Sequence, residues 1–407
     1  MKTGIKAKKI LLPNVLDMER WASIACDQFT SEEEYWKELY EFVGDAPSAS
    51  KLVYPEVYLE DDTENRIKKI NTEMKKYIEK GLFTELKEGL ILTVRTTPFV
   101  NRRIGIIASV DLETYDYKKG ERPLVRATEG TITERIPPRL KIRKDALIEF
   151  PHIMVLFDDD KREIAEDLYE KRDTLKKVYD FNLNMGGGKI EGYFIEDYKP
   201  VLEKFDALLD EDTLVRKYGF NDKFQFAVGD GNHSLATAKA HWENVKKNLT
   251  EEERESHPAR YALAEFVNIY DEGIYFEPIF RFVMGVDREK FISGLEKLDG
   301  NFTVIGGKEK VEKKSNITLP QTITALDGYI KDYIETNGGK VDYVHGEKNL
   351  EDLVEKENGV GIFLPKMDKS ELFKFVSARG ALPRKTFSMG EAVEKRYYLE
   401  GSYIVKW

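Results

Sequence analysis

Short apolar runs typical of strands and amphipathic runs typical of helices follow one another through residues 1–285 of this 407-residue chain. The run ENRIKKINTEMKKYIEKGLF (64–83) repeats apolar residues at spacings of three and four, which predicts an amphipathic helix. The runs LILTVRTTPF (90–99) and RIGIIASVDL (103–112) predict strands, and HIMVLF (152–157) predicts a buried strand. This mixture predicts an α/β (mixed α+β) fold with a large mixed-sheet core.

The length and the change of texture near residue 286 predict two domains. We expect a main α/β domain over 1–285, a smaller α/β domain over 286–380, and a segment over 381–407 that returns to the main domain. In the smaller domain, residues 308–316 are rich in lysine and are expected to be a connector.

Three local expectations accompany this division. A helix over 31–42 is expected to be capped by Thr30 or Ser31. The glycines of MGGGK (185–189) predict a hairpin turn, because a strand pattern follows them. The run KRYYLEGSY (395–403) predicts a strand with one wet face.

The net charge and the apolar runs exclude several classes of partner. A formal charge of -10 disfavours general binding to nucleic acid or to an anionic membrane surface. No apolar run approaches the roughly 20 residues that cross a membrane, and no secretion signal is recognised, so we expect a cytoplasmic protein. A single cysteine, Cys26, leaves no internal disulfide, and a small buried side chain is favoured over a nucleophile.

One segment departs from the acidic average. Residues 122–145 contain seven basic and three acidic side chains, a local charge of +4. A basic patch of this size on an acidic chain favours a small anionic or phosphorylated ligand over a polymer.

The segment FAVGDGNHSLATAKAHW (226–242) combines a strand pattern, a polar turn and an alanine-rich helix pattern. We expect a strand that ends at Val228 and a helix that begins near Ser234. The turn over 229–233 would then lie at the positive end of a helix dipole, where unpaired N–H groups bind phosphate. The predicted binding residues are Gly229, Gly231, Asn232, His233 and Ser234.

Two objections to an anion site keep an alternative open. Asp-Gly is a common turn, and Asn232 or Ser234 is a good helix cap, so an ordinary capped helix also fits this pattern. Asp230 would repel an anion unless it orients His233 or a magnesium ion lies between them. The histidine spacing predicts no zinc site, and no haem is expected either.

The turn and its flanking segments resemble a known family. The run VGDGNHSLATAKA resembles the D-G-H-H-R-x-x-A-A signature of the uncharacterised domain-of-unknown-function family numbered one thousand and fifteen. The run RATEGTITERIPPR is similar to that family's H-E-x-T and D-R segments, with Glu129, Thr131 and Arg139 matching and Thr128 and Pro138 differing. A third segment keeps the family's polar and basic positions Asn268, Asp271 and Arg281 and has Phe280 at the His.

The signature also resembles, more remotely, the loop-to-helix site of the ParB, sulfiredoxin and free-serine-kinase superfamily, in which the loop holds nucleotide phosphates. This resemblance implies a nucleotide ligand, and the charge of Asp230 leads us to expect magnesium with it. Asn232 stands at the first His of the signature and Ser234 at its Arg. The resemblance therefore implies that another cation replaces that Arg. We expect it to come from the basic segment 122–145, which contains Arg126, Arg139 and Arg143.

Two functions from different classes follow. The first is an enzyme that transfers or hydrolyses a phosphoryl group on a small metabolite, with Glu129 or Asp230 as general base and His233 in the catalytic turn. The second is a non-catalytic sensor of a small anionic ligand. The sequence leaves the substrate, the metal and the oligomeric state undetermined.

Overall fold

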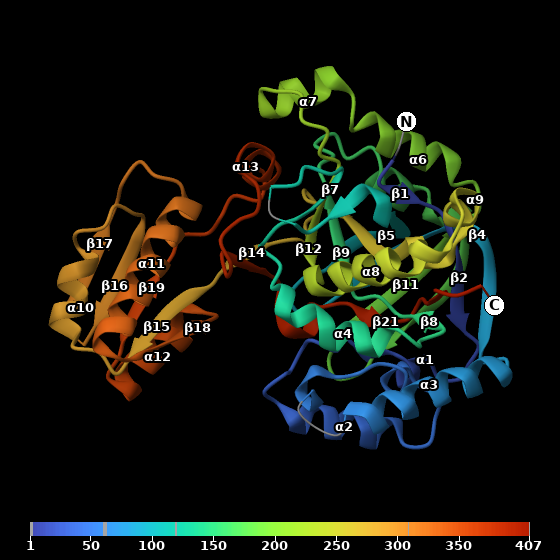
Figure 1. The fold of residues 1–407 in the computed structure, drawn as a ribbon, viewed down its shortest axis with the longest axis horizontal. Coiled ribbons are helices and arrows are strands. Elements are labelled where there is room, and N and C mark those ends of the chain that lie inside the picture. Colours follow the sequence, from blue (N-terminus) through green and yellow to red (C-terminus); the bar gives the residue numbers. More distant parts are fainter. Residues whose placement is uncertain (1–2, 60–62, 119, 308, 407) are drawn as a thin grey trace. The chain divides into compact units, whose positions relative to one another are not determined.

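The computed structural model describes residues 3–59, 63–118, 120–307 and 309–406 (Figure 1). Within these residues, eleven strands form one mixed sheet in the order β10-β11-β4-β5-β13-β9-β12-β7-β6, with β1 paired to β5 and β2 to β4. The strands are β1 (Ile5–Lys6), β2 (Lys8–Pro13), β4 (Phe83–Thr96), β5 (Arg103–Asp111), β6 (Tyr115–Asp116), β7 (Val125–Ala127), β9 (Met154–Phe157), β10 (Lys176–Leu183), β11 (Gly188–Ile195), β12 (Phe226–Asp230) and β13 (Tyr261–Asn268).

The pairing of these strands confirms the mixed α/β class. The pairs from β10 to β13 are antiparallel, whereas β9 runs parallel to β13 and antiparallel to β12. Strand β7 runs parallel to both of its neighbours, β12 and β6. Strands β10 and β11 form the hairpin expected around the MGGGK turn.

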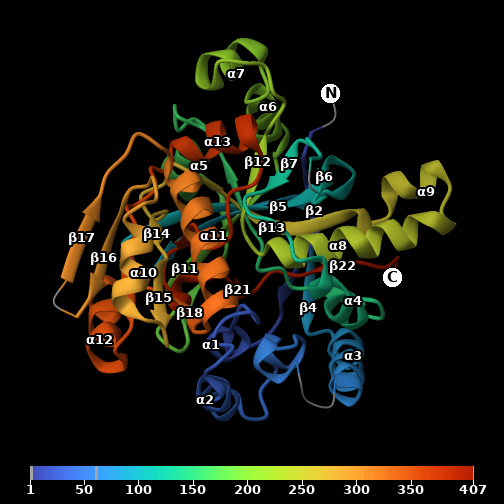
Figure 2. The same ribbon diagram turned by 60° about the vertical axis from the view of Figure 1, so that its left-hand side comes forward.

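Both faces of the sheet are covered by helices. Alternate residues of a strand point to opposite faces, and in β4 Leu90 and Leu92 join one apolar cluster while Ile91 joins the other. The first cluster includes Phe205 of α6 (Lys199–Ala207), and the second includes Trp36 of α2 (Glu33–Val43) and Ile70 of α3 (Thr63–Glu79). Figures 1 and 2 both show α6 on one side of the sheet and α2 and α3 on the other. This two-sided cover explains why β5 is buried at every residue.

The helices around this sheet follow the sequence patterns closely. They are α1 (Met18–Trp21), α2 (Glu33–Val43), α3 (Thr63–Glu79), α4 (Ile136–Arg143), α5 (Ala165–Glu170), α6 (Lys199–Ala207), α7 (Glu211–Tyr218), α8 (Asn232–Val245) and α9 (Glu251–Ser256). The expected cap of α2 is wrong, because Glu32 is the residue at that position. Phe29 adopts a φ of 53° and its carbonyl accepts from Glu32 N, so Thr30 and Ser31 lie inside a tight turn. Among the described residues, no helix is long and apolar enough to cross a membrane.

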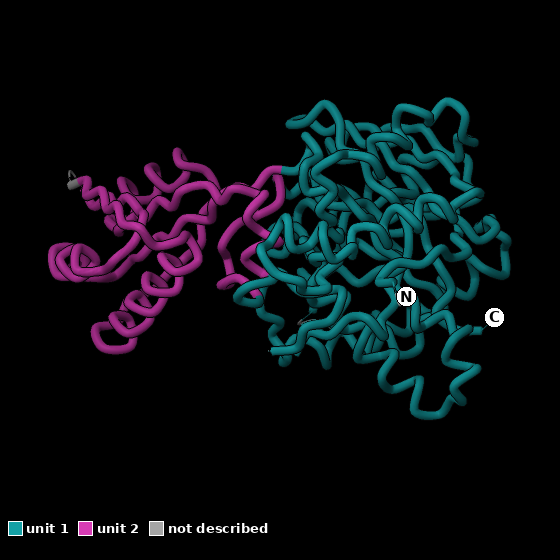
Figure 3. Tube along the Cα trace, turned by 90° about the horizontal axis from the view of Figure 1, so that it is seen from above, with its two compact units in different colours: residues 1–274, 377–380, 391–407 teal, residues 275–376, 381–390 magenta. Residues whose placement is uncertain are grey.

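The chain divides into two compact units (Figure 3). Unit 1 comprises 1–274, 377–380 and 391–407, and unit 2 comprises 275–376 and 381–390. The expected boundaries at 286 and 381 lie about ten residues from these limits, because β14 (Phe276–Pro278) pairs with β20 (Phe387–Met389) inside unit 2.

Unit 2 is built on an antiparallel sheet in the order β17-β16-β19-β15-β18. Its elements are β15 (Phe280–Met284), α10 (Arg288–Leu295), β16 (Phe302–Gly306), β17 (Glu309–Lys313), α11 (Leu319–Asn337), β18 (Lys340–Val344), α12 (Glu347–Glu357), β19 (Val360–Phe363) and α13 (Glu371–Arg379), which ends in unit 1. The lysine-rich segment expected as a connector contains β17. Its residues pair with β16 at the sheet edge, where lysine side chains tolerate solvent.

The end of the chain returns to unit 1 as two short strands. Strand β21 (Tyr397–Tyr398) pairs with β3 (Ser23–Ile24), and β22 (Ser402–Tyr403) pairs with β8 (Ile148–Glu149). The expectation of one wet face is wrong for β21, because Tyr397 and Tyr398 are both 2% exposed. The return segment is thus part of the core of unit 1.

Candidate functional site

The turn between β12 and α8 has the backbone form of an anion-binding helix entrance. Gly231 occupies the cap position of α8 with a left-handed φ of 76°. A Cβ atom on Gly231 would lie 3.0 Å from the Ile153 Cα, so only glycine fits without displacing the neighbouring chain. The strand continues to Asp230 and the helix begins at Asn232, so the turn is tighter than the sequence predicted.

Among the described residues, no side chain forms a cap hydrogen bond at the amino terminus of α8. Asp230 Oδ1 accepts from Gly231 N at 2.9 Å. Asn232 is 7% exposed, and its Oδ1 atom is buried with no hydrogen-bond partner among the described residues. An unpaired buried oxygen and an uncapped 14-residue helix meet here, which is the arrangement expected of a site that a ligand completes.

His152 connects the turn to the amino-terminal and carboxyl-terminal segments. Its Nε2 lies 3.0 Å from Ser234 Oγ and 3.3 Å from an Asp27 oxygen, and its Nδ1 lies 2.8 Å from the Tyr398 hydroxyl. These partners lie far from His152 along the chain, so no local pattern in the sequence predicts this contact.

The electrostatics of this contact favour an ion pair. Burial acts to lower the pKa of His152, but the charge and hydrogen bond of Asp27 outweigh it, and the pKa is raised. Burial likewise acts to raise the pKa of Asp27, and the His152 charge reverses this, so that pKa is lowered. His152 is therefore held as an imidazolium beside Ser234 over a wider pH range than a free histidine.

Lys395 places a second cation at the turn. Its Nζ lies 3.1 Å from Asp230 Oδ2, and the two side chains are only 11% and 22% exposed. The β21 pairing brings Lys395 here from 165 positions along the chain, which is why sequence reasoning missed it. Lys395 neutralises Asp230, the residue whose charge was the main objection to an anion at this turn.

The predicted arginines are engaged elsewhere. Arg126 is buried and bonds both oxygens of Asp222, at 2.6 and 2.8 Å, at the start of β12 rather than at its turn end. Arg139 pairs with Glu56, and Arg143 with Glu149 at 2.6 Å. Each of these three carboxylates lies outside the turn, whereas Lys395 pairs with Asp230 in the turn itself and His152 contacts Ser234.

The segment over 128–132 lies beside the turn. Thr128 Oγ1 donates to the Val228 carbonyl at 2.7 Å, and Ile132 N donates to His233 Nε2 at 3.3 Å. Accepting that bond leaves Nε2 of His233 without a proton. Thr131 Oγ1 is buried and, among the described residues, has no hydrogen-bond partner. The segment containing Glu129 is thus held beside the turn by its neighbours Thr128 and Ile132.

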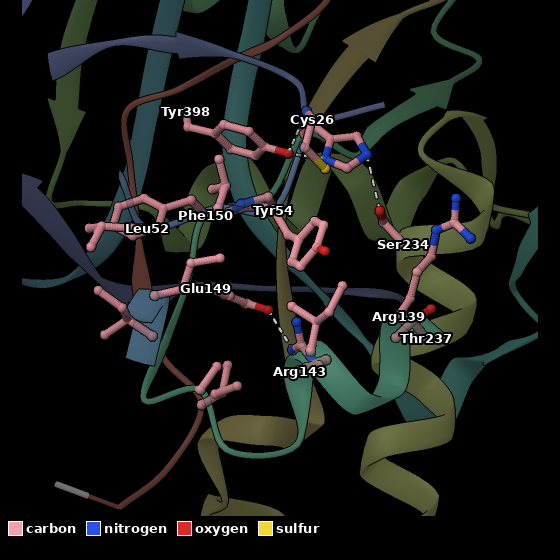
Figure 4. Close-up of a pocket in the computed structure, with 18 of the residues that line it drawn as sticks. Cys26, Leu52, Tyr54, Arg139, Arg143, Glu149, Phe150, Ser234, Thr237 and Tyr398 are labelled. Atoms are coloured by element: carbon pink, nitrogen blue, oxygen red, sulfur yellow. Dashed lines mark hydrogen bonds and ion pairs between the residues drawn. The ribbon is translucent and has the colours of Figure 1, made fainter. Parts of the chain in front are cut away.

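A cavity of about 160 Å³ opens next to Ser234 and His152 (Figure 4). Its wall comes from residues 52–59, α3, α4, α8, residues 146–153 around β8, and the return segment, with Cys26. The lining residues are Cys26, Leu52, Val53, Tyr54, Glu56, Leu59, Ile70, Met74, Arg139, Ile142, Arg143, Ala146, Ile148, Glu149, Phe150, Pro151, His152, Ile153, Ser234, Thr237, Tyr398 and Ile404. Burial raises the pKa of the Cys26 thiol far above its usual value, which keeps the thiol protonated and unreactive.

The described side chains form no cluster of three or more histidine, cysteine or acidic groups arranged as metal ligands. The oxygens nearest the turn that suit a hard cation belong to Asp230 and Asn232. Magnesium was invoked to offset the negative charge of Asp230 beside an anion, and Lys395 already supplies a positive charge at that carboxylate.

Comparison with known proteins places the chain in a family. Residues 7–369 match the family described as "Protein of unknown function (DUF1015)". The chain belongs to this family. No curated protein matches it.

Three solved structures resemble this DUF1015 chain at low identity. They are a conserved hypothetical protein from Pyrococcus furiosus (9% identity, TM-score 0.36, covering 74% of this chain and 95% of that one), SbnI with a carboxyl-terminal truncation from Staphylococcus aureus (11%, 0.37, 70% and 82%), and a free serine kinase in complex with AMP (8%, 0.38, 74% and 91%). Likeness at this level does not determine a function, so the site itself carries the functional argument.

Proposed function

We propose that unit 1 binds the phosphate groups of a nucleotide at the entrance of α8 and transfers one phosphoryl group to the hydroxyl of a small metabolite. The observation that carries this proposal is the amino terminus of α8, which among the described residues has no side-chain cap hydrogen bond, with Lys395 and His152 beside it.

The backbone supplies the first part of the attraction. The amino terminus of a helix carries the equivalent of about half a positive charge and presents N–H groups without internal partners. Gly231 adopts the left-handed cap conformation of the turn and lets the Ile153 backbone pack against it. The Ser234 hydroxyl can add a donor, and so can the Thr131 hydroxyl, which has no hydrogen-bond partner among the described residues.

Lys395 and Asp230 then act together. In the free protein the Lys395 ammonium is paired with Asp230, and a bound phosphate would take over that ammonium. Asp230 would be released to accept the proton of the metabolite hydroxyl, or to join Asn232 in holding a magnesium ion that enters with the nucleotide. Glu129 is the other candidate base, since its segment contacts His233 through Ile132.

The chemical step balances without a further reactant. The hydroxyl oxygen of the metabolite forms a bond to the terminal phosphorus, and the bond from that phosphorus to the bridging oxygen breaks. The bridging oxygen keeps the electron pair and leaves with the shortened nucleotide. The hydroxyl proton passes to the carboxylate base, and the cations at the turn stabilise the charge on the transferred group.

The decisive experiment is a calorimetric titration of ATP, ADP and CTP, each with magnesium, into the full chain. We expect Lys395→Gln to weaken the best nucleotide about 10- to 150-fold, as for the loss of a charge-assisted hydrogen bond of about 1.5–3 kcal/mol. Lys177→Gln is the matched control, because Lys177 is an equally paired lysine on the edge strand β10. Absence of binding by all three nucleotides would refute the proposal.

A sensor without catalysis is the second candidate. Ser234 stands at the position of the expected Arg, and its hydroxyl is engaged by His152 instead of presenting a charge. A site that keeps the helix entrance but lacks that Arg can bind an anion without activating it. Nucleotide-dependent thermal stabilisation with no nucleotide turnover would support this function over the enzyme.

A further inference from the structure

The cavity beside Ser234 is predominantly apolar, in contrast to the polar turn. Its wall combines aliphatic side chains from α3 and α4 with aromatic rings, and Figure 4 shows Leu52, Tyr54 and Phe150 on one part of it and Ser234 and Thr237 on another. A ligand that enters the cavity would therefore meet hydroxyl and imidazole groups at one part of the wall and hydrocarbon over most of the rest.

The size of the cavity indicates how large an apolar group it holds. Its volume is about 160 Å³. An apolar cavity of roughly 150 Å³ in another protein stays dry and binds benzene. The cavity is thus large enough for a group of about six carbon atoms, whereas a lone water molecule would find few polar partners there.

The polar groups of the wall specify where the ligand's own polar atoms lie. Ser234 Oγ and His152 Nε2 stand 3.0 Å apart at the wall nearest the turn. Arg143 has a buried Nε atom with no hydrogen-bond partner among the described residues, although its Nη2 bonds Glu149. A ligand hydroxyl beside Ser234 and a single acceptor toward Arg143 would satisfy both positions.

We propose that this cavity binds the apolar body of the phosphoryl acceptor, so that the acceptor is a small alcohol with a hydrocarbon or aromatic group of about six carbons. This assignment of a substrate class rests on the function proposed above. It places the acceptor hydroxyl at the rim, between the Ser234–His152 pair and the phosphate site on α8. Larger acceptors and fully polar ones, such as glycerol, do not match the cavity.

Methyl-detected NMR of the full chain can test the cavity with benzyl alcohol as the probe. We expect benzyl alcohol to shift the methyl signals of Ile142 and Ile148, which line the cavity, while glycerol at the same concentration shifts neither. Ala146→Leu and Ile142→Phe each add bulk to the wall and should weaken benzyl alcohol at least tenfold. Ala207→Leu, at an exposed position of α6, is the matched control and should leave it unchanged.

The same samples separate this proposal from the preceding one, because nucleotide affinity is measured on each. Loss of benzyl alcohol binding in both filled variants, with nucleotide affinity and melting temperature retained, supports the cavity assignment. Alcohol binding that survives both variants, or that is absent in the natural chain, overturns it. Alcohol binding without any nucleotide binding overturns the proposed transfer and leaves the cavity as a ligand site.

Discussion

Replacing Gly231 by alanine tests whether the entrance of α8 depends on glycine for the reasons inferred from its geometry. Two costs add at this position. The left-handed conformation, with φ of 76°, costs about 1–2 kcal/mol for a residue with a Cβ atom. The new Cβ would also lie 3.0 Å from the Ile153 Cα, a backbone atom that cannot turn aside, and such overpacking costs typically about 1–3 kcal/mol.

The sum predicts that Gly231→Ala lowers the free energy of unfolding of unit 1 by roughly 2–5 kcal/mol. Gly219→Ala is the matched control. Gly219 has a φ of 85° at the end of α7, but nothing lies within 4 Å of its missing Cβ, so only the conformational cost applies. The difference between the two variants isolates the contact with Ile153.

Urea unfolding followed by tryptophan fluorescence measures both variants in the intact chain. All four tryptophans belong to unit 1, so the signal reports on the unit that contains the turn. Nucleotide affinity should fall in Gly231→Ala and stay unchanged in Gly219→Ala. If Gly231→Ala destabilises unit 1 no more than Gly219→Ala does, the close approach of Ile153 is not a constraint and the reasoning is refuted.

The other predictions concern His152 and its neighbours. Because the pKa of His152 is raised in the folded state, its contribution to stability is complete below about pH 6.5 and is lost as the pH rises through the raised pKa. Because the pKa of Asp27 is lowered, its contribution is complete above about pH 3.8 and is lost as the pH falls through the lowered pKa. Urea unfolding across pH should therefore show that the pair adds most to the free energy of unfolding between about pH 3.8 and pH 6.5. Asp27→Asn should make this free energy depend less on pH, and an unchanged pH dependence contradicts the ion pair. Tyr398→Phe removes a hydroxyl that contacts His152 Nδ1 and accepts from Cys26 N. This variant should lower the free energy of unfolding by about 1–3 kcal/mol in the same assay, and a decrease smaller than about 0.5 kcal/mol would contradict a buried hydrogen bond of this kind.

Local patterns predicted most elements because each depends on neighbours along the chain. The apolar spacing of 64–83 was enough for α3, and the unbroken apolar runs were enough for β5 and β9. The patterns were weaker where pairing decides the conformation. Strand β17 looked like a lysine-rich connector, and it is a strand because β16 offers it a partner at a sheet edge.

The helix entrance followed from the sequence, and the cations that face it did not. Glycine and aspartate at a strand-to-helix junction have only a few backbone forms available, so the turn could be placed to within two residues. Arg126 was predicted because it belongs to the basic segment 122–145, and a local charge pattern does not determine which carboxylate its side chain contacts. The sheet instead directs Arg126 to Asp222 at the opposite end of β12.

What the sequence determined by itself was the mixed α/β class, the elements that build it and the turn before α8, since these depend on residues a few positions apart. Only the tertiary structure decided what surrounds the turn. Asp27, His152 and Lys395 come from three segments separated by more than 100 residues each, and they meet because β21 pairs with β3 in the core of unit 1. Contacts of this kind depend on strand pairing across the whole chain, which no local spacing of residues encodes.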